Sequence, residues 1–483
     1  MVFAMPPLSL RPSRDAGAMA AAAVQPNSTL SAIPSYILFA VIAGAPLPFG
    51  SVDFTAISFW CIVLGCVAVT LALFPHRFAA GHLAVLGGLA LLAAFYLFVL
   101  HEQLADAPWI ASPHPIWAET SKALGLAVAP AVSITRDEPF FALGAPLACM
   151  LALACGLVVG IDRNRAYQIL QVIAWSGAAY AIYGILSFLI EPTMILWRDK
   201  RAYLGSVTGT FINRNTAATY FGSCAVIWFA ILLDRMRRHL PRGQLNWKRA
   251  PQRILTDTPR KIIIAFLMLF VCLMAMFLTG SRAGVVLSLL ALIITFTIYF
   301  RRDLPPRTGI WIAMAGGGAV ALILLQFMGG VVSSRFDVQG LADEGRLAAY
   351  RSTLRMIADY PWFGTGIGTF AWSFPAYRSP EISLRGVWDI AHNTPLELAA
   401  DLGLPLAGTI YLAWIAILAI LIRGIRTRSR SLVPLAAFSV SIIAVLHSFV
   451  DFSLQIPGFA IVLFALLGAG VAQSFDIKPA NKA

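Results

Sequence analysis

Residues 262–300 read IIIAFLMLFVCLMAMFLTGSRAGVVLSLLALIITFTIYF, and Arg282 is the only charged residue among them. A run of about 20 apolar residues is long enough to cross the hydrocarbon core of a bilayer as a helix. Two such runs, 262–279 and 283–300, follow each other here with almost no loop between them. The stretch therefore predicts a pair of transmembrane helices that turn back tightly at Arg282.

The same pattern recurs along the chain, which is 59% hydrophobic and only 12% charged. Soluble domains carry roughly 25% charged residues, and an outer-membrane barrel would show alternating strands of roughly 10 residues instead of unbroken apolar runs. We therefore predict an all-α polytopic membrane protein with about 12 transmembrane helices. The expected spans are 33–49, 54–74, 82–101, 140–161, 166–190, 216–234, 262–279, 283–300, 309–328, 392–421, 432–450 and 454–473.

Composition divides the chain into successive parts. We predict a disordered cytoplasmic tail over 1–32, N-terminal transmembrane helices over 33–234, a basic cytoplasmic loop over 235–261, a second transmembrane region over 262–473 and a cytoplasmic tail over 474–483. The second region includes a large, partly helical extracytoplasmic loop, 329–391, between spans nine and ten. A cleaved signal peptide is the alternative for the first part, but its run of alanines lacks the Leu, Ile and Phe of a hydrophobic signal region.

The distribution of basic residues predicts the orientation in the membrane. With both termini in the cytoplasm, the inner segments hold 23 of the 36 Lys and Arg residues, as the positive-inside rule requires. Basic clusters beside the membrane are attracted to anionic lipid headgroups. Membrane lipids therefore explain the net charge of +13, and we do not expect nucleic acid as a partner.

Loop 329–391 carries the charge that the spans lack, with 6 Arg and 6 Asp or Glu between Ser333 and Ile390. Apolar residues over 347–357 recur at helical spacing, and Arg351 and Arg355 lie one turn apart on the flank of that stripe. The glycines of 364–368 lack the spacing and the preceding strand of a nucleotide-binding loop. They predict a tight turn after the helix.

Three short motifs on the predicted outer side place polar residues where a span begins or ends. LTGSRAG at 278–284 holds Arg282, which either binds a ligand or anchors the helix by snorkelling. GTFINRN at 209–215 is either a binding motif or a polar helix start capped by Asn215. In HNTPLELAADLG at 392–403, Asn393, Glu397 and Asp401 share one helix face. Acids inside a span are costly unless they are paired or used.

Together these motifs resemble the O-antigen ligase family, membrane glycan transferases that also include O-antigen and exopolysaccharide polymerases. The resemblance covers roughly 205–470. It rests further on Gly345-Arg346 followed by Tyr350, on PWFGTGIGTF at 361–370 and on HSFVD at 447–451. The first 200 residues are similar only as apolar helices.

The resemblance implies a metal-independent, inverting transfer of a glycan from a polyprenyl (undecaprenyl) diphosphate carrier to an acceptor hydroxyl, without a cofactor. Arg282 and Arg346 would stabilise the negative charge of the leaving diphosphate. His392 would take the proton of the acceptor or orient the acceptor. The residues expected to bind substrate are Arg214, Asn215, Arg351, Arg355, Asn393 and Glu397.

The implied partners are the lipid-linked glycan donor, a glycan or lipid A-core type acceptor, and membrane lipids. The implied location is the bacterial inner membrane, with the active site facing the periplasm. Glu397 is one candidate for orienting His392, although about 140° around a helix axis separates the two side chains. The HSFVDF segment at 447–452 is expected to close the outer face near the same site, and a purely structural role is the alternative for it.

Two questions of function stay open at this point. Ligase and polymerase are nearly equal alternatives, because both use the same donor and differ in the acceptor. A secondary transporter with 12 spans is the rival class. Transporters place polar residues and broken helices near the bilayer midplane, whereas ionisable residues here gather at the predicted outer edge.

Overall fold

The computed structural model describes residues 32–239, 259–304, 308–328, 344–382, 388–427 and 432–475. Within these ranges, 8 helical segments are long and apolar enough to cross a membrane. They are α3 (Phe54–Ala72), α4 (Ala80–Leu104), the run Glu138–Gly160 made of α6 (Glu138–Ala142) and α7 (Gly144–Gly160), α8 (Arg163–Ile190), α9 (Arg214–His239), α11 (Arg260–Leu278), α12 (Arg282–Phe300) and α18 (Leu404–Thr427).

Four shorter apolar segments accompany them. They are α2 (Ile33–Gly44), Trp311–Leu324 inside α13 (Gly309–Met328), α19 (Leu432–Ser448) and α20 (Pro457–Ala472). Each expected span therefore coincides with an apolar helix, and the prediction of an all-helical polytopic membrane protein is confirmed at that level. How many of these helices cross the bilayer stays a prediction. The expected tails and most of the expected basic loop lie outside the described residues.

One expected span differs from the prediction. Residues 392–421 do not form one helix, because α17 (Thr394–Leu402) ends at Gly403 and α18 begins at Leu404. Gly403 has a φ of 80°, and a Cβ there would lie 2.2 Å from the carbonyl oxygen of Trp362. The N–H of Leu404 donates to the Pro361 carbonyl at 2.7 Å. Glycine thus permits a break between the two helices, and the backbone of Pro361 and Trp362 packs against this break.

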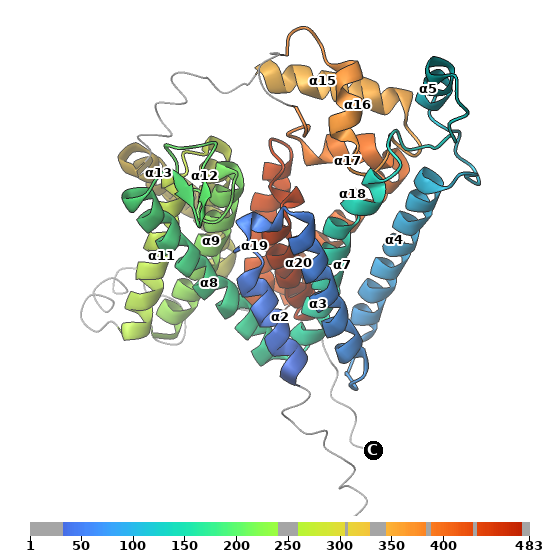
Figure 1. Ribbon diagram of the computed structural model, residues 1–483. Helices are drawn as coiled ribbons and strands as arrows, with labels where there is room; N and C mark the ends of the chain where they lie inside the picture. The colour runs from blue at the N-terminus through green and yellow to red at the C-terminus, as the bar shows by residue number, and fades with distance from the viewer. Residues whose placement is uncertain are drawn as a thin grey trace, which may run out of the picture.

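The core is built around α9, whose residues are almost all buried. The helices α8, α11, α12 and α19 pack around it (Figure 1). Close backbone contact joins α7 to α20, because a Cβ at Gly156 would lie 2.3 Å from the carbonyl oxygen of Ala465; small residues allow such contact between membrane helices. In contrast, few residues of α3, α4 and α18 are buried inside the protein, as expected of helices in contact with lipid.

The polar insert lies across one end of the helix bundle (Figure 1). It contains α15 (Glu344–Asp359), α16 (Phe370–Tyr377) and α17, and α5 (Ile116–Leu124) lies beside it. The expected turn over 364–368 is confirmed: its three glycines have positive φ, and the N–H of Thr365 donates to the Ala400 carbonyl at 2.9 Å. Gln103 of α4 donates to the Phe363 carbonyl at 2.7 Å and so fixes this turn to the bundle.

The same end of the bundle also carries a short hairpin and two 3-10 turns. Strands β1 (Met194–Ile195) and β2 (Arg198–Asp199) pair antiparallel between α8 and α9. The turn η2 (Phe49–Ser51) follows α2, and η3 (Ser453–Gln455) lies between α19 and α20.

Candidate active site

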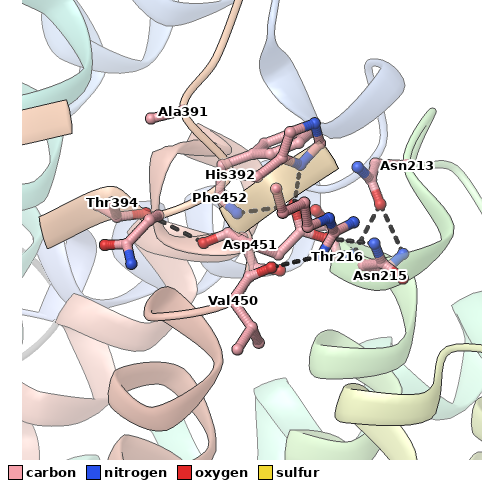
Figure 2. A network of polar contacts seen from close by, with 12 residues as sticks. Asn213, Asn215, Thr216, Ala391, His392, Thr394, Val450, Asp451 and Phe452 are labelled. Carbon is pink, nitrogen blue, oxygen red and sulfur yellow. Dashed lines mark hydrogen bonds and ion pairs between the residues drawn. The ribbon is translucent and has the colours of Figure 1, made fainter. Parts of the chain in front are cut away.

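Three connections far apart in the sequence meet beneath the insert. They are the segment 209–215 before α9, the segment 388–394 before α17, and the link 449–456 between α19 and α20. Figure 2 shows side chains from all three joined by a continuous set of hydrogen bonds. The motifs GTFINRN, HNTPLELAADLG and HSFVD, which are far apart in the sequence, are therefore neighbours in space.

Asp451 is the centre of this network, and only 2% of its surface is exposed. Its Oδ1 lies 3.1 Å from Nδ1 of His392 and accepts the backbone N–H of Phe452 at 2.9 Å. Its Oδ2 accepts a hydrogen bond from the side-chain amide of Asn215. Thr394 donates its hydroxyl to the Asp451 carbonyl at 3.3 Å. A single buried carboxylate thus connects the starts of α9 and α17.

The charge state of Asp451 follows from these neighbours. Burial by itself raises the pKa of this carboxyl, but the hydrogen bond from His392 and the nearby His447 and Arg346 outweigh burial and hold the pKa below its ordinary value. Asp451 is therefore an ionised, acceptor-only group at neutral pH. Arg346 of α15 is held beside this carboxylate, because its Nη1 donates to the carbonyl of the preceding residue, Val450, at 2.6 Å.

His392 is held rigidly by this arrangement. Its φ is 53°, an unusual value for a residue other than glycine, and the Tyr350 hydroxyl donates to its carbonyl at 3.0 Å. The rings of Trp388 and Phe452 meet the imidazole edge-on, with ring centroids 5.7 and 5.2 Å from the imidazole centroid. Strain of this kind persists where the surroundings fix it and is typical of functional sites.

The tautomer of His392 follows from the charge of its partner. An ionised Asp451 only accepts, so Nδ1 of a neutral imidazole carries the hydrogen and Nε2 keeps its lone pair. Within the described residues, no group hydrogen-bonds Nε2, and 26% of the side chain is exposed. In this tautomer Nε2 can accept a proton, while Nδ1 on the other side of the ring faces the buried carboxylate of Asp451.

The start of α9 differs from the helix start expected from sequence. Asn213, not Asn215, caps this helix: its Oδ1 accepts the N–H groups of Asn215 at 2.6 Å and Thr216 at 3.4 Å. The alternative with Asn215 as the cap is wrong, and its side chain is instead directed to Asp451 (Figure 2). Arg214 lies over the ring of Tyr203 at 4.9 Å.

Arg282 begins α12 at the same end of the bundle. The hydroxyl of Ser281 caps this helix by accepting the N–H of Gly284 at 3.3 Å. A Cβ at Gly284 would lie 2.5 Å from the Cβ of Ala218, so the first turns of α12 and α9 touch. The small residues of the LTGSRAG motif therefore place Arg282 beside the helix that supplies Asn215.

Of the remaining predicted binding residues, Arg351 and Arg355 have contacts within the insert. Arg351 lies 3.8 Å from the exposed carboxylate of Glu381, and Arg355 donates to the Tyr377 carbonyl at 3.0 Å. Neither joins the His392 network. Asn393 caps α17 by accepting the N–H of Leu396 at 3.1 Å, and its amide donates to the Phe449 carbonyl at 2.9 Å.

Glu397 does not orient His392. Its Oε2 accepts the N–H of Ala391 at 2.7 Å, and Asp451 holds the imidazole instead. Burial raises the pKa of Glu397 to about 7, although the hydrogen bonds from Ala391 and Gln455 act in the opposite direction. The orienting role of Asp451 was missed in the sequence. Its position in the short HSFVD link between two spans was the available signal.

Within the described residues, no group of three or more His, Cys, Asp or Glu side chains is placed to hold a metal ion. A family model described as O-antigen ligase matches residues 264–412. No curated protein matches the chain. The matched region includes Arg282, Arg346 and His392, whereas Asn215 and Asp451 lie outside it on either side.

Proposed function

The match over residues 264–412 assigns the chain to the O-antigen ligase family, and from it we propose that the chain transfers a glycan from a polyprenyl diphosphate carrier to an acceptor hydroxyl. Membrane glycan transfer of the ligase or polymerase type is the common property of the family. The donor, the acceptor, the inverting outcome and the periplasmic face are our proposal. The observation that carries it is the His392–Asp451 pair with an accessible Nε2.

In the proposed step, the acceptor oxygen forms a bond to the anomeric carbon of the glycan. The bond between that carbon and the diphosphate oxygen breaks, and its electron pair leaves with the lipid diphosphate. His392 Nε2 takes the proton of the acceptor hydroxyl, and Asp451 stabilises the imidazolium that forms. Attack opposite the leaving group inverts the anomeric centre.

Arg282 and Arg346 supply positive charge for the leaving diphosphate in this proposal. A guanidinium donates two parallel hydrogen bonds to a phosphate, and donors fixed in advance stabilise charge that develops in the transition state. Arg346 is fixed by its bond to the Val450 carbonyl, next to Asp451. Arg282 is fixed at the first residue of α12. No metal ion is needed in this scheme.

The lipid carrier also explains why the site lies at one end of an apolar bundle. A polyprenyl chain stays in the bilayer while its diphosphate reaches the membrane surface. The insert with α15 to α17 covers the same end (Figure 1). By the count of basic residues, this end faces the periplasm of a bacterial inner membrane.

Deletion of the gene, with complementation by variants, tests this function. Loss of the chain should cause the lipid-linked glycan to accumulate. Complementation with His392→Ala should leave the lipid-linked glycan at this raised level. His114→Ala is the matched control, because His114 lies in the link between α4 and α5 and bonds the N–H of Ile116, outside the network. Unchanged lipid-linked glycan in the deletion strain would contradict the proposal.

The same experiment separates ligase from polymerase. A ligase should leave long glycan on its carrier and none on the final acceptor, such as a lipid A-core type molecule. A polymerase should leave single repeat units on the carrier. The donor chemistry at His392 is the same in either case.

A further inference from the structure

A separate pocket lies beside the hairpin β1–β2. The hairpin itself lies at the end of the bundle that carries the insert (Figure 1). Its volume is about 640 Å³. The hairpin belongs to the segment 191–213, which joins the ends of the candidate spans α8 and α9. The lining residues are Phe49, Ile195, Trp197, Arg198, Asp199, Lys200, Arg201, Ala202 and Ile212.

Three of the lining residues are basic and one is acidic. Arg201 is exposed, and within the described residues its side chain has no hydrogen bond or ion pair. Arg198 lies over the ring of Phe49 at 4.2 Å and 3.5 Å from the exposed carboxylate of Asp53. Lys200 is buried and donates to the Ser206 carbonyl at 2.6 Å. The pocket therefore has a positive surface on which Arg201 is available to an anion.

The pocket is also lined by apolar side chains that are exposed. Trp197 is 69% exposed and Ile212 is 47% exposed, while Trp197 meets the ring of Phe49 edge-on at 5.2 Å. Trp side chains of this kind prefer the boundary between lipid and water. A positive surface next to exposed apolar side chains suits a ligand that has an anionic head and an apolar chain.

The backbone around the pocket is strained. Among the described residues, five that are not glycine have positive φ: Phe49, Ser51, Leu196, Tyr203 and His392. Phe49 lines this pocket, Leu196 and Tyr203 directly adjoin lining residues, Ser51 lies two residues from Phe49, and His392 is the proposed base. Such conformations are unfavourable and are retained where the surroundings require them, often at ligand sites.

We propose that this pocket binds the phosphate group of an anionic lipid, with Arg198 and Arg201 at the phosphate and Trp197 and Ile212 along the chain. The inference goes beyond glycan transfer and does not depend on it. The pocket and the active site are linked through the chain, because Ile212 directly precedes Asn213, the cap of the helix that carries Asn215. An anionic lipid bound here is therefore placed next to the segment that positions Asp451.

Fluorescence of Trp197 in nanodiscs tests the site. The full-length chain is placed in phosphatidylcholine nanodiscs that contain a small fraction of brominated phosphatidylglycerol or brominated phosphatidylcholine. The signal of Trp197 is taken as the difference between the native chain and Trp197→Phe. Brominated phosphatidylglycerol should quench this signal much more strongly. Replacing both arginines, Arg198→Gln and Arg201→Gln, should weaken that preference roughly tenfold to thirtyfold.

Lys122→Gln is the matched control, because Lys122 is an exposed cation of α5 at the same end of the bundle. It should leave the quenching unchanged, and all variants should melt at the same temperature as the native chain. Inorganic pyrophosphate in the buffer identifies the source of the anion. Displacement of the brominated lipid by pyrophosphate would support a site for phosphate itself, and no displacement would support a site for a lipid headgroup. Equal quenching by the two brominated lipids would overturn the proposal.

Discussion

Asp451→Asn should reduce the rate of glycan transfer roughly tenfold to a hundredfold while the protein still folds. The substitution keeps the size of the side chain but removes the negative charge that faces Nδ1 of His392 at 3.1 Å. Hydrogen bonds to charged groups contribute about 1.5–3 kcal/mol, and each 1.36 kcal/mol is a factor of ten in rate. The amide of Asn215 can turn to accept from the new side chain, so the packing is preserved.

The assay is transfer from a lipid-diphosphate glycan by purified chain, with kcat and KM measured separately. The loss should fall on kcat, because the imidazolium that Asp451 stabilises forms only as the acceptor proton moves. His392→Ala should lose at least as much. Asp106→Asn is the control, since Asp106 forms an exposed ion pair with Arg136 at 2.9 Å, and such pairs contribute little. A normal kcat for Asp451→Asn would refute the proposed role of the pair.

Arg282→Lys should insert normally yet lose about 3 kcal/mol of transition-state stabilisation, roughly a hundredfold in rate, because Lys lacks the two-pronged donor geometry. Near-normal transfer by this variant would leave Arg282 as a membrane anchor. As the control, Arg302→Lys should not change the rate, because Arg302 is exposed. The pKa of Glu397 is raised from 4.5 to about 7 by burial, so its contribution to stability is full below 4.5 and is lost as pH rises through about 7. Glu397→Gln should therefore flatten the fall in melting temperature between pH 5 and 8, and an unchanged slope would contradict this. In a background without native cysteines, an impermeant thiol reagent on intact cells should label Ala376→Cys on α16 and spare Gln244→Cys. The reverse pattern would place the active site in the cytoplasm.

The sequence predicted most of the helices, because apolar runs of sufficient length are a direct signal. It did not predict the break at Gly403, since hydropathy carries no information about the carbonyl of Trp362 that approaches there. A break of this kind depends on a second segment of chain. The tight turn at 364–368 was predictable because glycine spacing is local.

The candidate site was predictable only in part for the same reason. Motif resemblance named His392, Arg282, Arg346 and Asn215 as candidates, and of these His392 and Asn215 both contact Asp451. The partner of His392 lies 59 residues further along the chain, and nothing in the spacing pairs the two. Glu397 is closer to His392 in sequence than Asp451 is, but its carboxylate accepts the backbone N–H of Ala391 instead.

The most direct test of the central claim uses the purified chain in nanodiscs with a polyprenyl-diphosphate glycan, a hydroxyl acceptor and excess EDTA. The measurement is the amount of lipid diphosphate released against the amount of new glycosidic bond formed. The account predicts one released diphosphate for each bond, at the same rate with and without EDTA. Activity that is lost in EDTA and restored by Mg²⁺ or Mn²⁺ would contradict the assignment of the leaving-group charge to Arg282 and Arg346.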